Sequence, residues 1–245
     1  MGEHRFGVDI GGTGIKGAVV DLDSGELVTE RVRILTPHPA TPEAVVPVVA
    51  GLVSQADFTG GVGCAFPAVI KDGVAQTAAN IDKSWIGTSV SHLVSAKLDG
   101  AAVTVINDAD AAGVAEMRFG AGRDVGGVVV MLTIGTGIGS AVFLDGVLVP
   151  NTELGHLEVD GHDAETRASE IAREEHDLSR KQWAKRFNRY LEVLEALLWP
   201  DLVILGGGVS KEPEKFMPLL TSRARIVPAT LANAAGIIGA ALVAS

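Results

Sequence analysis

The chain has 245 residues, of which 47% are hydrophobic and 20% charged. This composition is typical of a globular protein with a sizeable core, and it excludes a disulfide-stabilised miniprotein, a coiled coil and a disordered chain. Thirty acidic and 20 basic residues give a net charge of −10, so we expect no nucleic-acid partner. With one cysteine, Cys64, and neither a signal peptide nor a membrane span evident in the sequence, we expect a cytoplasmic protein without a membrane partner.

Strand-like and helix-like segments alternate along the chain and predict an α/β fold. In chain order they are a strand at 6–10, a helix from Thr41-Pro42 to about Val53, strands at 62–66 and 103–106 around a helix at 88–98, a strand at 128–134, a helix from Trp183 that Pro200 ends, and a strand at 202–205. Because Pro42 suits the first helical position, the Thr41 hydroxyl is predicted to cap the first helix.

Glycine contributes 30 residues, and three glycine clusters directly follow predicted strands. They are Gly11-Gly12-Thr13-Gly14, Gly135-Thr136-Gly137-Ile138-Gly139 and Gly206-Gly207-Gly208. One such cluster is weak support for a ligand site because glycine often serves only a tight turn, but three predict places where the backbone approaches a ligand. The first two clusters and their flanking strands also resemble each other, which predicts a duplicated hairpin in two related lobes with a ligand cleft between them.

Phosphoryl transfer requires backbone N–H groups for the phosphates, an acid for Mg²⁺ and a base for the attacking hydroxyl. Asp9 ends a predicted strand beside the first glycine cluster, where it could hold Mg²⁺ directly or through water, or could merely cap the turn. Asp108 follows a short strand and precedes a helix of small residues, a place that suits a general base. The alternative is that Asn107 or Asp108 only caps that helix.

Five motifs together resemble the repressor–ORF–kinase (ROK) family of sugar kinases, within the actin-like, hexokinase-like superfamily. They are Asp9-Ile-Gly-Gly-Thr13, Asn107-Asp108, Thr133-Ile-Gly-Thr-Gly-Ile-Gly139, Glu153-Leu-Gly-His156 and Leu205-Gly-Gly-Gly-Val209. The resemblance runs from about residue 6 to the C-terminus. Three finer stretches, at 78–86, 107–113 and 150–158, are similar to the branch of actinobacterial polyphosphate glucokinases and polyphosphate/ATP glucomannokinases.

The resemblance implies a two-lobed fold of duplicated ribonuclease H-like domains with the active site in the interlobe cleft. The small N-terminal lobe would comprise residues 1–107, with a C-terminal helix at about 233–245 packing back on it, and the large lobe residues 108–232. It also implies a homodimer that phosphorylates glucose at its 6-hydroxyl with polyphosphate, and with ATP, as donor. A strictly ATP-dependent glucokinase, a glucomannokinase that also accepts mannose, and a non-catalytic sugar- or nucleotide-responsive scaffold remain alternatives.

The resemblance assigns Asp108 as the general base, while Asp9 stays the candidate Mg²⁺ residue by its place beside the first glycine cluster. It assigns the sugar hydroxyls to Asn80, Asn107, Glu153, His156 and Glu170. The residues expected to bind phosphate or nucleotide are Gly11, Gly12, Thr13, Lys16, Thr133, Gly135, Thr136, Gly137, Gly206, Gly207 and Gly208.

Two further expectations concern charge and metal. Lys181, Lys185 and Arg189 recur every four residues on one helix face, which with Lys83 could form a track for polyphosphate or could simply face water. Many ROK members carry a cysteine-rich zinc motif just after the Gly-His pair, whereas residues 161–170 here contain no cysteine. Because His156, His162 and Asp163 alone make a poor zinc ligand set, we predict an enzyme without zinc.

Overall fold

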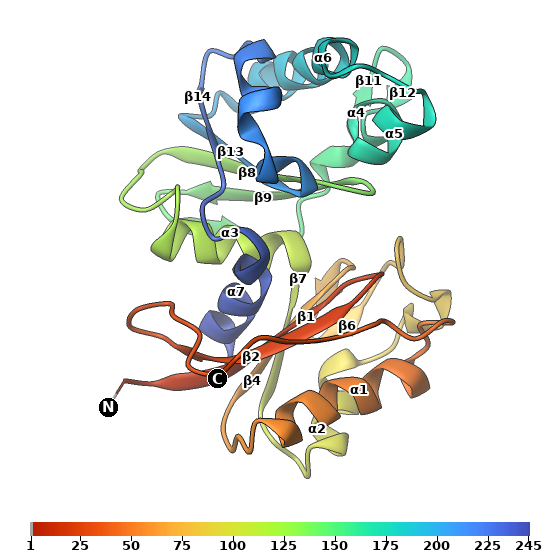
Figure 1. Ribbon diagram of the computed structural model, residues 1–245, viewed down its shortest axis with the longest axis vertical. Helices are drawn as coiled ribbons and strands as arrows, with labels where there is room; N and C mark the ends of the chain where they lie inside the picture. The colour runs from red at the N-terminus through yellow and green to blue at the C-terminus, as the bar shows by residue number, and fades with distance from the viewer. Residues whose placement is uncertain (1) are drawn as a thin grey trace. The chain divides into compact units, whose positions relative to one another are not determined.

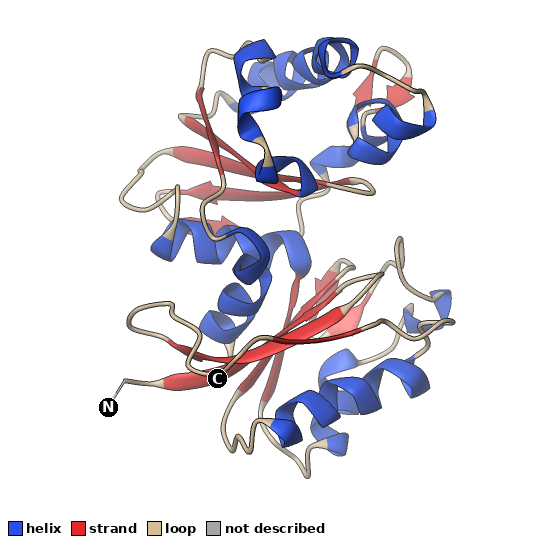
Figure 2. Ribbon diagram, viewed as in Figure 1, coloured by secondary structure: helices blue, strands red, loops and turns tan. Residues whose placement is uncertain are grey.

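The computed structural model describes residues 2–245, which form two compact units (Figure 1). Unit 1 comprises Met1–Ala115 with Ala234–Ser245, and unit 2 comprises Glu116–Asn233. Each unit contains a five-stranded sheet covered by helices (Figure 2), so the α/β fold class predicted from the sequence is confirmed. In the part of the chain described, no helix has both the length and the apolar character needed to cross a bilayer.

The sheet of unit 1 has the order β3-β2-β1-β4-β7, with β1 antiparallel to β2 and parallel to β4. Its strands are β1 (His4–Ile10), β2 (Ile15–Asp21), β3 (Val32–Ile34), β4 (Val62–Phe66) and β7 (Val103–Asn107). Helices α1 (Pro42–Gln55) and α2 (Val90–Lys97) lie on one face and α7 (Ala235–Val243) on the other (Figure 1). The connection between β4 and α2 contains the hairpin of β5 (Ile70–Lys71) and β6 (Val74–Ala75) and the 3₁₀ turn η1 (Lys83–Trp85).

Glycines in the sheet let α7 approach the strands closely. A Cβ at Gly7 would lie 2.0 Å from the Ile237 carbonyl oxygen, and a Cβ at Gly63 would lie 1.7 Å from that of Ala240. Only hydrogen fits at these positions, so the helix backbone lies directly on β1 and β4. The C-terminal helix is therefore an integral part of unit 1.

The sheet of unit 2 repeats this topology in the order β10-β9-β8-β13-β14. Its strands are β8 (Val128–Ile134), β9 (Ile138–Leu144), β10 (Val147–Val149), β13 (Leu202–Gly207) and β14 (Arg225–Pro228). In each sheet the first strand along the chain is antiparallel to the second, the third is antiparallel to the second, and the fourth pairs parallel with the first. The duplicated hairpin predicted from the glycine clusters is confirmed. Its turns span residues 11–14 and 135–137, a difference of one residue that explains the offset between the two sequences.

Helix α3 (Asp108–Phe119) begins in unit 1 and ends in unit 2. The other helices of unit 2 are α4 (Glu165–Ala168), α5 (Glu170–Glu175) and α6 (Arg180–Leu198), with the short hairpin of β11 (Glu158–Val159) and β12 (His162–Asp163). The 3₁₀ turns are η2 (Leu154–His156), η3 (Gly208–Lys211), η4 (Pro213–Lys215), η5 (Met217–Leu219) and η6 (Ala232–Ala234).

Two helix N-termini show how local chemistry sets the boundaries. Helix α6 begins three residues before Trp183 because Ser179 and Gln182 form a reciprocal capping box. At α1 the prediction of a Thr41 hydroxyl cap was wrong, since this side chain makes no capping hydrogen bond. The Thr41 carbonyl instead accepts hydrogen bonds from the N–H groups of Ala44 and Val45 at 3.1 and 2.9 Å, and Pro42 has no N–H that needs a partner.

Candidate functional site

The first glycine turn, between β1 and β2, places a carboxylate and an ammonium group side by side. Asp9 and Lys16 are paired across the two strands, and the Lys16 Nζ lies 2.7 Å from Asp9 Oδ2. Both side chains are about four-fifths buried, at 22% exposure for Lys16 and 17% for Asp9. The Asp9 carboxyl also lies against the first turn of α7, since a Cβ at Gly236 would be 3.0 Å from its Cγ. The turn therefore combines backbone amides, a fixed carboxylate and a cation.

The loop that carries Asn80 lies against this first turn. A Cβ at Gly12 would be 2.9 Å from the Asn80 carbonyl oxygen, so glycine is needed for the close approach. Asn80 itself is exposed, and Asp82 caps the following 3₁₀ turn by accepting a hydrogen bond from the Ser84 N–H at 2.8 Å. The exposed Lys83 begins that turn. Unit 1 thus brings one predicted sugar residue next to a predicted phosphate turn.

At the end of β7, Asn107 caps α3. Its Oδ1 accepts hydrogen bonds from the N–H groups of Ala109 and Asp110 at 2.9 and 3.0 Å, and its Nδ2 donates to the Ala68 carbonyl at 3.1 Å. The capping role weighed from the sequence therefore falls to Asn107, which is 93% buried. Asp108, the first residue of α3, also accepts a hydrogen bond from the Ala109 N–H at 2.9 Å, while the Asp110 N–H bonds to Asn107.

Residues of α4 and α5 hold the second glycine turn, which lies between β8 and β9. The Gly135 carbonyl accepts hydrogen bonds from the N–H groups of Glu170 and Ile171 at 3.1 and 3.3 Å. The Ile138 N–H donates to Glu165 Oε2 at 3.1 Å, and a Cβ at Gly137 would be 2.2 Å from the same oxygen. Thr136 is exposed at the tip, while Thr133 is half-buried on β8.

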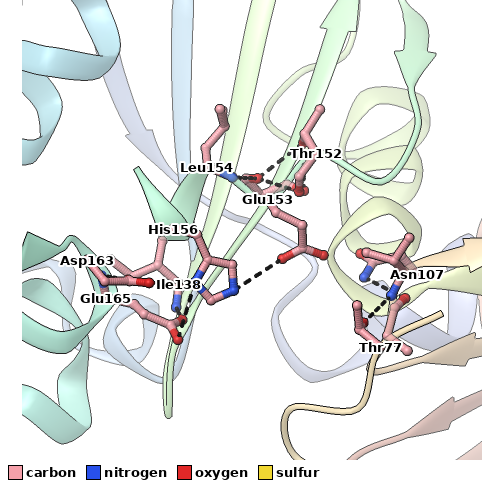
Figure 3. A network of polar contacts seen from close by, with 12 residues as sticks. Thr77, Asn107, Ile138, Thr152, Glu153, Leu154, His156, Asp163 and Glu165 are labelled. Atoms are coloured by element: carbon pink, nitrogen blue, oxygen red, sulfur yellow. Dashed lines mark hydrogen bonds and ion pairs between the residues drawn. The ribbon is translucent and has the colours of Figure 1, made fainter. Parts of the chain in front are cut away.

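Glu153 and His156 belong to a cluster of polar side chains within unit 2 (Figure 3). The Nδ1 of His156 lies 2.8 Å from Asp163 Oδ2, and because a carboxylate can only accept, Nδ1–H is the donor. The other ring nitrogen, Nε2, then faces Glu153 Oε2 at 3.9 Å, while Glu165 Oε1 lies 3.9 Å from Nδ1. Three carboxylates therefore surround one imidazole.

This arrangement shifts two pKa values in the same direction. The hydrogen bond that His156 donates to Asp163, aided by the charges of Glu165, Asp163 and Glu153, raises the pKa of His156 above its ordinary value despite partial burial. Burial and the neighbouring charge of Glu165 raise the pKa of Glu153, although His156 opposes the shift. Both pKa values therefore move towards the protonated form.

The cluster does not fit a structural zinc ion of the kind found with cysteine-rich ROK motifs. His156, Asp163 and Glu165 offer ligand atoms within 4.8 Å of one another. They supply three ligands instead of four and no thiolate, and the Nδ1 that would face the ion carries the proton bonded to Asp163. The role left for Asp163 is to orient the imidazole.

The third glycine cluster ends β13. Gly207 has a φ of 80°, and its Cβ would lie 2.4 Å from the Ile134 carbonyl oxygen, so both its conformation and its contact with β8 require glycine. Gly206 pairs with Thr133 across the sheet, and Gly208 begins η3. The second and third clusters therefore follow adjacent parallel strands and lie at the same end of the sheet.

The remaining predicted residues have partners or face solvent. Both oxygens of Glu170 are engaged, one by Arg173 Nε at 2.9 Å and the other by Arg180 Nη1 at 2.6 Å. Lys181, Lys185 and Arg189 are exposed on α6, and Arg189 binds Asp160 through Nε and Nη2 at 3.0–3.2 Å.

Sequence reasoning missed two residues of the unit 2 cluster. Glu165 contacts both the second glycine turn and His156, and Asp163, weighed only as a zinc ligand, orients the imidazole. The available signal was a pair of acids seven and nine residues after His156. Their spacing along the chain does not reveal a contact with His156, because the β11–β12 hairpin is what brings the two acids back to it.

Two sheets of the same topology, each with a glycine-rich turn after its first strand, define the fold of the actin-like, hexokinase-like phosphotransferases. Residues 5–169 match the ROK family. The chain is 52% identical over 239 residues to the polyphosphate glucokinase of Mycobacterium tuberculosis, covering 98% of this chain and 90% of that protein.

Solved structures agree with this match. The crystal structure of the inorganic polyphosphate/ATP-glucomannokinase from Arthrobacter sp. strain KM superposes with a TM-score of 0.93 at 52% identity, covering 98% of this chain and 97% of that one. A ROK family glucokinase from Streptomyces griseus, solved with glucose and AMPPNP, gives a TM-score of 0.82 at 26% identity, with 99% of both chains covered. The chain belongs to the ROK family, as predicted from its motifs.

Proposed function

We propose that this protein phosphorylates glucose at the 6-hydroxyl with inorganic polyphosphate as donor, and with ATP as a second donor. The observation that carries the proposal is 52% identity over nearly the whole chain to a polyphosphate glucokinase, together with the intact Asn107-Asp108 and Glu153-Leu-Gly-His156 motifs. At this identity the fold and the donor and acceptor chemistry are expected to be shared.

Asp108 is the general base in this proposal. It is the first residue of α3, directly after the end of β7, and a carboxylate at this place suits a base that takes the proton from the 6-hydroxyl as that oxygen attacks the terminal phosphoryl group. The bond to the leaving phosphate breaks as the new ester bond forms, and the sugar proton passes to Asp108.

The residues proposed to bind sugar hydroxyls are Asn80 and Asn107 in unit 1, and Glu153 and His156 in unit 2. A polyol needs donors and acceptors at defined places, and unpaired groups reject the wrong sugar. His156 supplies an oriented Nε2 because Asp163 holds Nδ1, and Glu153 supplies carboxylate oxygens. Glu170 is the weakest member of the proposed set, because Arg173 and Arg180 already bind its carboxylate.

The glycine turns and Asp9 form the proposed donor site. The N–H groups of Gly11 and Gly135 close their own turns by donating to the Gly14 and Gly137 carbonyls at 3.1 and 3.0 Å. The amides at 12–13 and 136–137 suit phosphate oxygens, and Lys16 adds positive charge. Asp9 would hold Mg²⁺ directly or through water, since one carboxylate with water and donor phosphates is a usual ligand set, and the ion would neutralise charge on the donor phosphates. Asp9 is bound to Lys16 in the protein alone, so Mg²⁺ binding would share or displace that ion pair.

The proposal includes several finer points. The enzyme contains no structural zinc, acts in the cytoplasm as a homodimer, and accepts mannose as a second sugar. The zinc point is supported by the missing thiolates and by the engaged Nδ1 of His156. The other three rest on resemblance to the family.

The test is a coupled assay of glucose 6-phosphate formation with nucleotide-free polyphosphate and with ATP as separate donors. Asp108→Asn is expected to keep glucose binding and to lose about 10²–10⁴-fold in kcat with either donor, whereas the exposed Asp124→Asn is the matched control and keeps its activity. Near-normal turnover by Asp108→Asn would remove Asp108 from the role. Glucose binding without turnover in the unaltered protein would favour the scaffold, and mannose in place of glucose tests the second acceptor.

A further inference from the structure

A basic cavity within unit 2 is lined by residues of the β11–β12 hairpin, α4 and α6. These elements are labelled in Figure 1. It has a volume of about 290 Å³. Its charged and hydroxyl lining residues are Asp160, His162, Arg167, Lys185, Arg186, Arg189 and Tyr190. Asp160 is the one carboxylate in this lining, and Arg189 binds it through two nitrogens. Arg167, Lys185 and Arg186 therefore leave the cavity with a surplus of positive charge.

Two donors in the cavity wall have no partner among the residues described. The Nε of Arg167 and the hydroxyl of Tyr190 are both buried without a hydrogen bond. Tyr190 as a whole is 99% buried. A buried polar group without a partner is unfavourable, and native proteins rarely contain one without a reason. Because both atoms are closed to solvent, a ligand in the cavity would reach them only after a small movement of the wall.

The cations also oppose one another. Burial and the charge of Arg167 lower the pKa of Arg186, which indicates that the two guanidinium groups are close enough to repel each other; both belong to the lining of the cavity. Arg186 otherwise donates from Nη1 to His176 Nδ1 at 2.8 Å, which does not neutralise its charge. The nearby carboxylate of Glu165, whose charge acts on Tyr190, is already bonded to the Ile138 N–H.

We propose that this cavity is a second anion site that binds phosphoryl groups. Guanidinium groups match tetrahedral oxyanions with paired N–H donors, and a lysine and a phenol add further donors. The volume is at the lower limit of ligand pockets, about 300 Å³, which suits one phosphate or a short phosphoryl segment better than a nucleotide. Of the track residues predicted from the sequence, Lys185 and Arg189 line the cavity, and Arg167, Arg186 and Tyr190 are new.

The phosphoryl group could come from a segment of the polyphosphate donor or from a free phosphate or phosphate monoester. Helix α4 connects the cavity with the second glycine turn, because Glu165 contacts that turn while Arg167, two residues later, lines the cavity. A donor chain held at the turn would thus have a basic site close by. Binding of a polyphosphate segment in the cavity rests on the proposed function, whereas binding of a free phosphate compound does not.

The sequence contains one tyrosine, Tyr190, so labelling the full-length protein with 3-fluorotyrosine places a single ¹⁹F probe in the cavity wall. Orthophosphate and tripolyphosphate, titrated at constant ionic strength, are expected to shift this resonance saturably. Arg167→Gln and Arg186→Gln should each weaken binding about tenfold or more, as expected for loss of a charge-assisted hydrogen bond. Arg225→Gln, which removes an exposed arginine of β14 outside the cavity, should titrate like the unaltered protein.

Thermal unfolding without phosphate separates binding from folding. Removing either arginine relieves like-charge repulsion, so Arg167→Gln and Arg186→Gln should melt no lower than the unaltered protein while binding phosphate more weakly. The proposal is overturned if no phosphate compound shifts the resonance saturably, or if both variants titrate normally.

Kinetics identify the source of the phosphoryl group. If Arg167→Gln raises KM for polyphosphate and leaves KM for ATP unchanged, the cavity holds the donor chain. If both KM values are unchanged while glucose 6-phosphate or orthophosphate shifts the resonance, the ligand is a free phosphate compound. An unaltered protein that forms no sugar phosphate would refute the proposed function and leave the ¹⁹F titration as an independent result.

Discussion

Gly63 lies where β4 meets α7, and its replacement by alanine is expected to separate the two. The new Cβ would lie 1.7 Å from the Ala240 carbonyl oxygen, whereas ordinary contacts begin at 3.4 Å. The obstructing atom belongs to the helix backbone and cannot rotate away. Relief therefore requires movement of roughly 1.7 Å, the difference between these two distances, in an interior packed as densely as a crystal.

The expected loss of stability follows from what α7 buries. Ile237 and Ile238 are 0% and 3% exposed, and burial of one such side chain contributes about 1.5–3 kcal/mol. Partial undocking of the helix should therefore cost about 3 kcal/mol or more, a large part of a typical stability of 5–15 kcal/mol. Because Gly236 of α7 also backs Asp9, sugar kinase activity should fall as well.

Cys64, the neighbour of Gly63, provides a local assay. It is the single cysteine of the chain, it is buried, and burial raises the pKa of its thiol to about 12, so it should react with a thiol reagent only when unit 1 opens. A loss of 3 kcal/mol corresponds to an increase of roughly a hundredfold in the reaction rate, if opening and closing are fast.

Gly51→Ala is the matched control. This glycine is exposed inside α1, and a Cβ there would meet nothing within 4 Å. The substitution should stabilise unit 1 by about 0.5–1 kcal/mol and slow the reaction of Cys64. If Gly63→Ala reacted no faster than the unaltered protein, the packing of α7 on β4 described here would be wrong.

Three further outcomes are expected. Asp163→Asn should lower the pKa of His156, measured by NMR titration, because the Asp163 hydrogen bond is the largest cause of its rise. A raised pKa stabilises the fold at low pH and loses this effect as pH rises through the folded value, so the variant should lose more stability below pH ~6.5 than above it. Gly12→Ala should raise KM for glucose, since the new Cβ would lie 2.9 Å from the Asn80 carbonyl oxygen. An unchanged KM would show that the loop of Asn80 does not take part in glucose binding. Zinc analysis of the purified protein should find no stoichiometric metal, and a chelator should leave its melting temperature unchanged.

Local sequence was sufficient for the central strands and for the duplication, whereas β3, β10 and β14 at the sheet edges were not predicted. Strands β4 and β8 occupy the residues predicted from their apolar runs, 62–66 and 128–134, because a buried strand is marked by its own composition. The two glycine turns resembled each other in sequence and proved to have equivalent places in two sheets of the same topology. The motifs also identified the ROK family, which the comparisons confirmed.

Tertiary structure decided which side chains meet. The sequence could not distinguish a capping Asn107 from a capping Asp108, because the choice depends on which side chain reaches the amides of α3. It also could not reveal that Asp163 orients His156, or that Arg167 and Tyr190 share a cavity, since these residues come from elements brought together only by folding. Composition and periodicity depend on neighbours along the chain, whereas hydrogen bonds, ion pairs and cavities depend on neighbours in space.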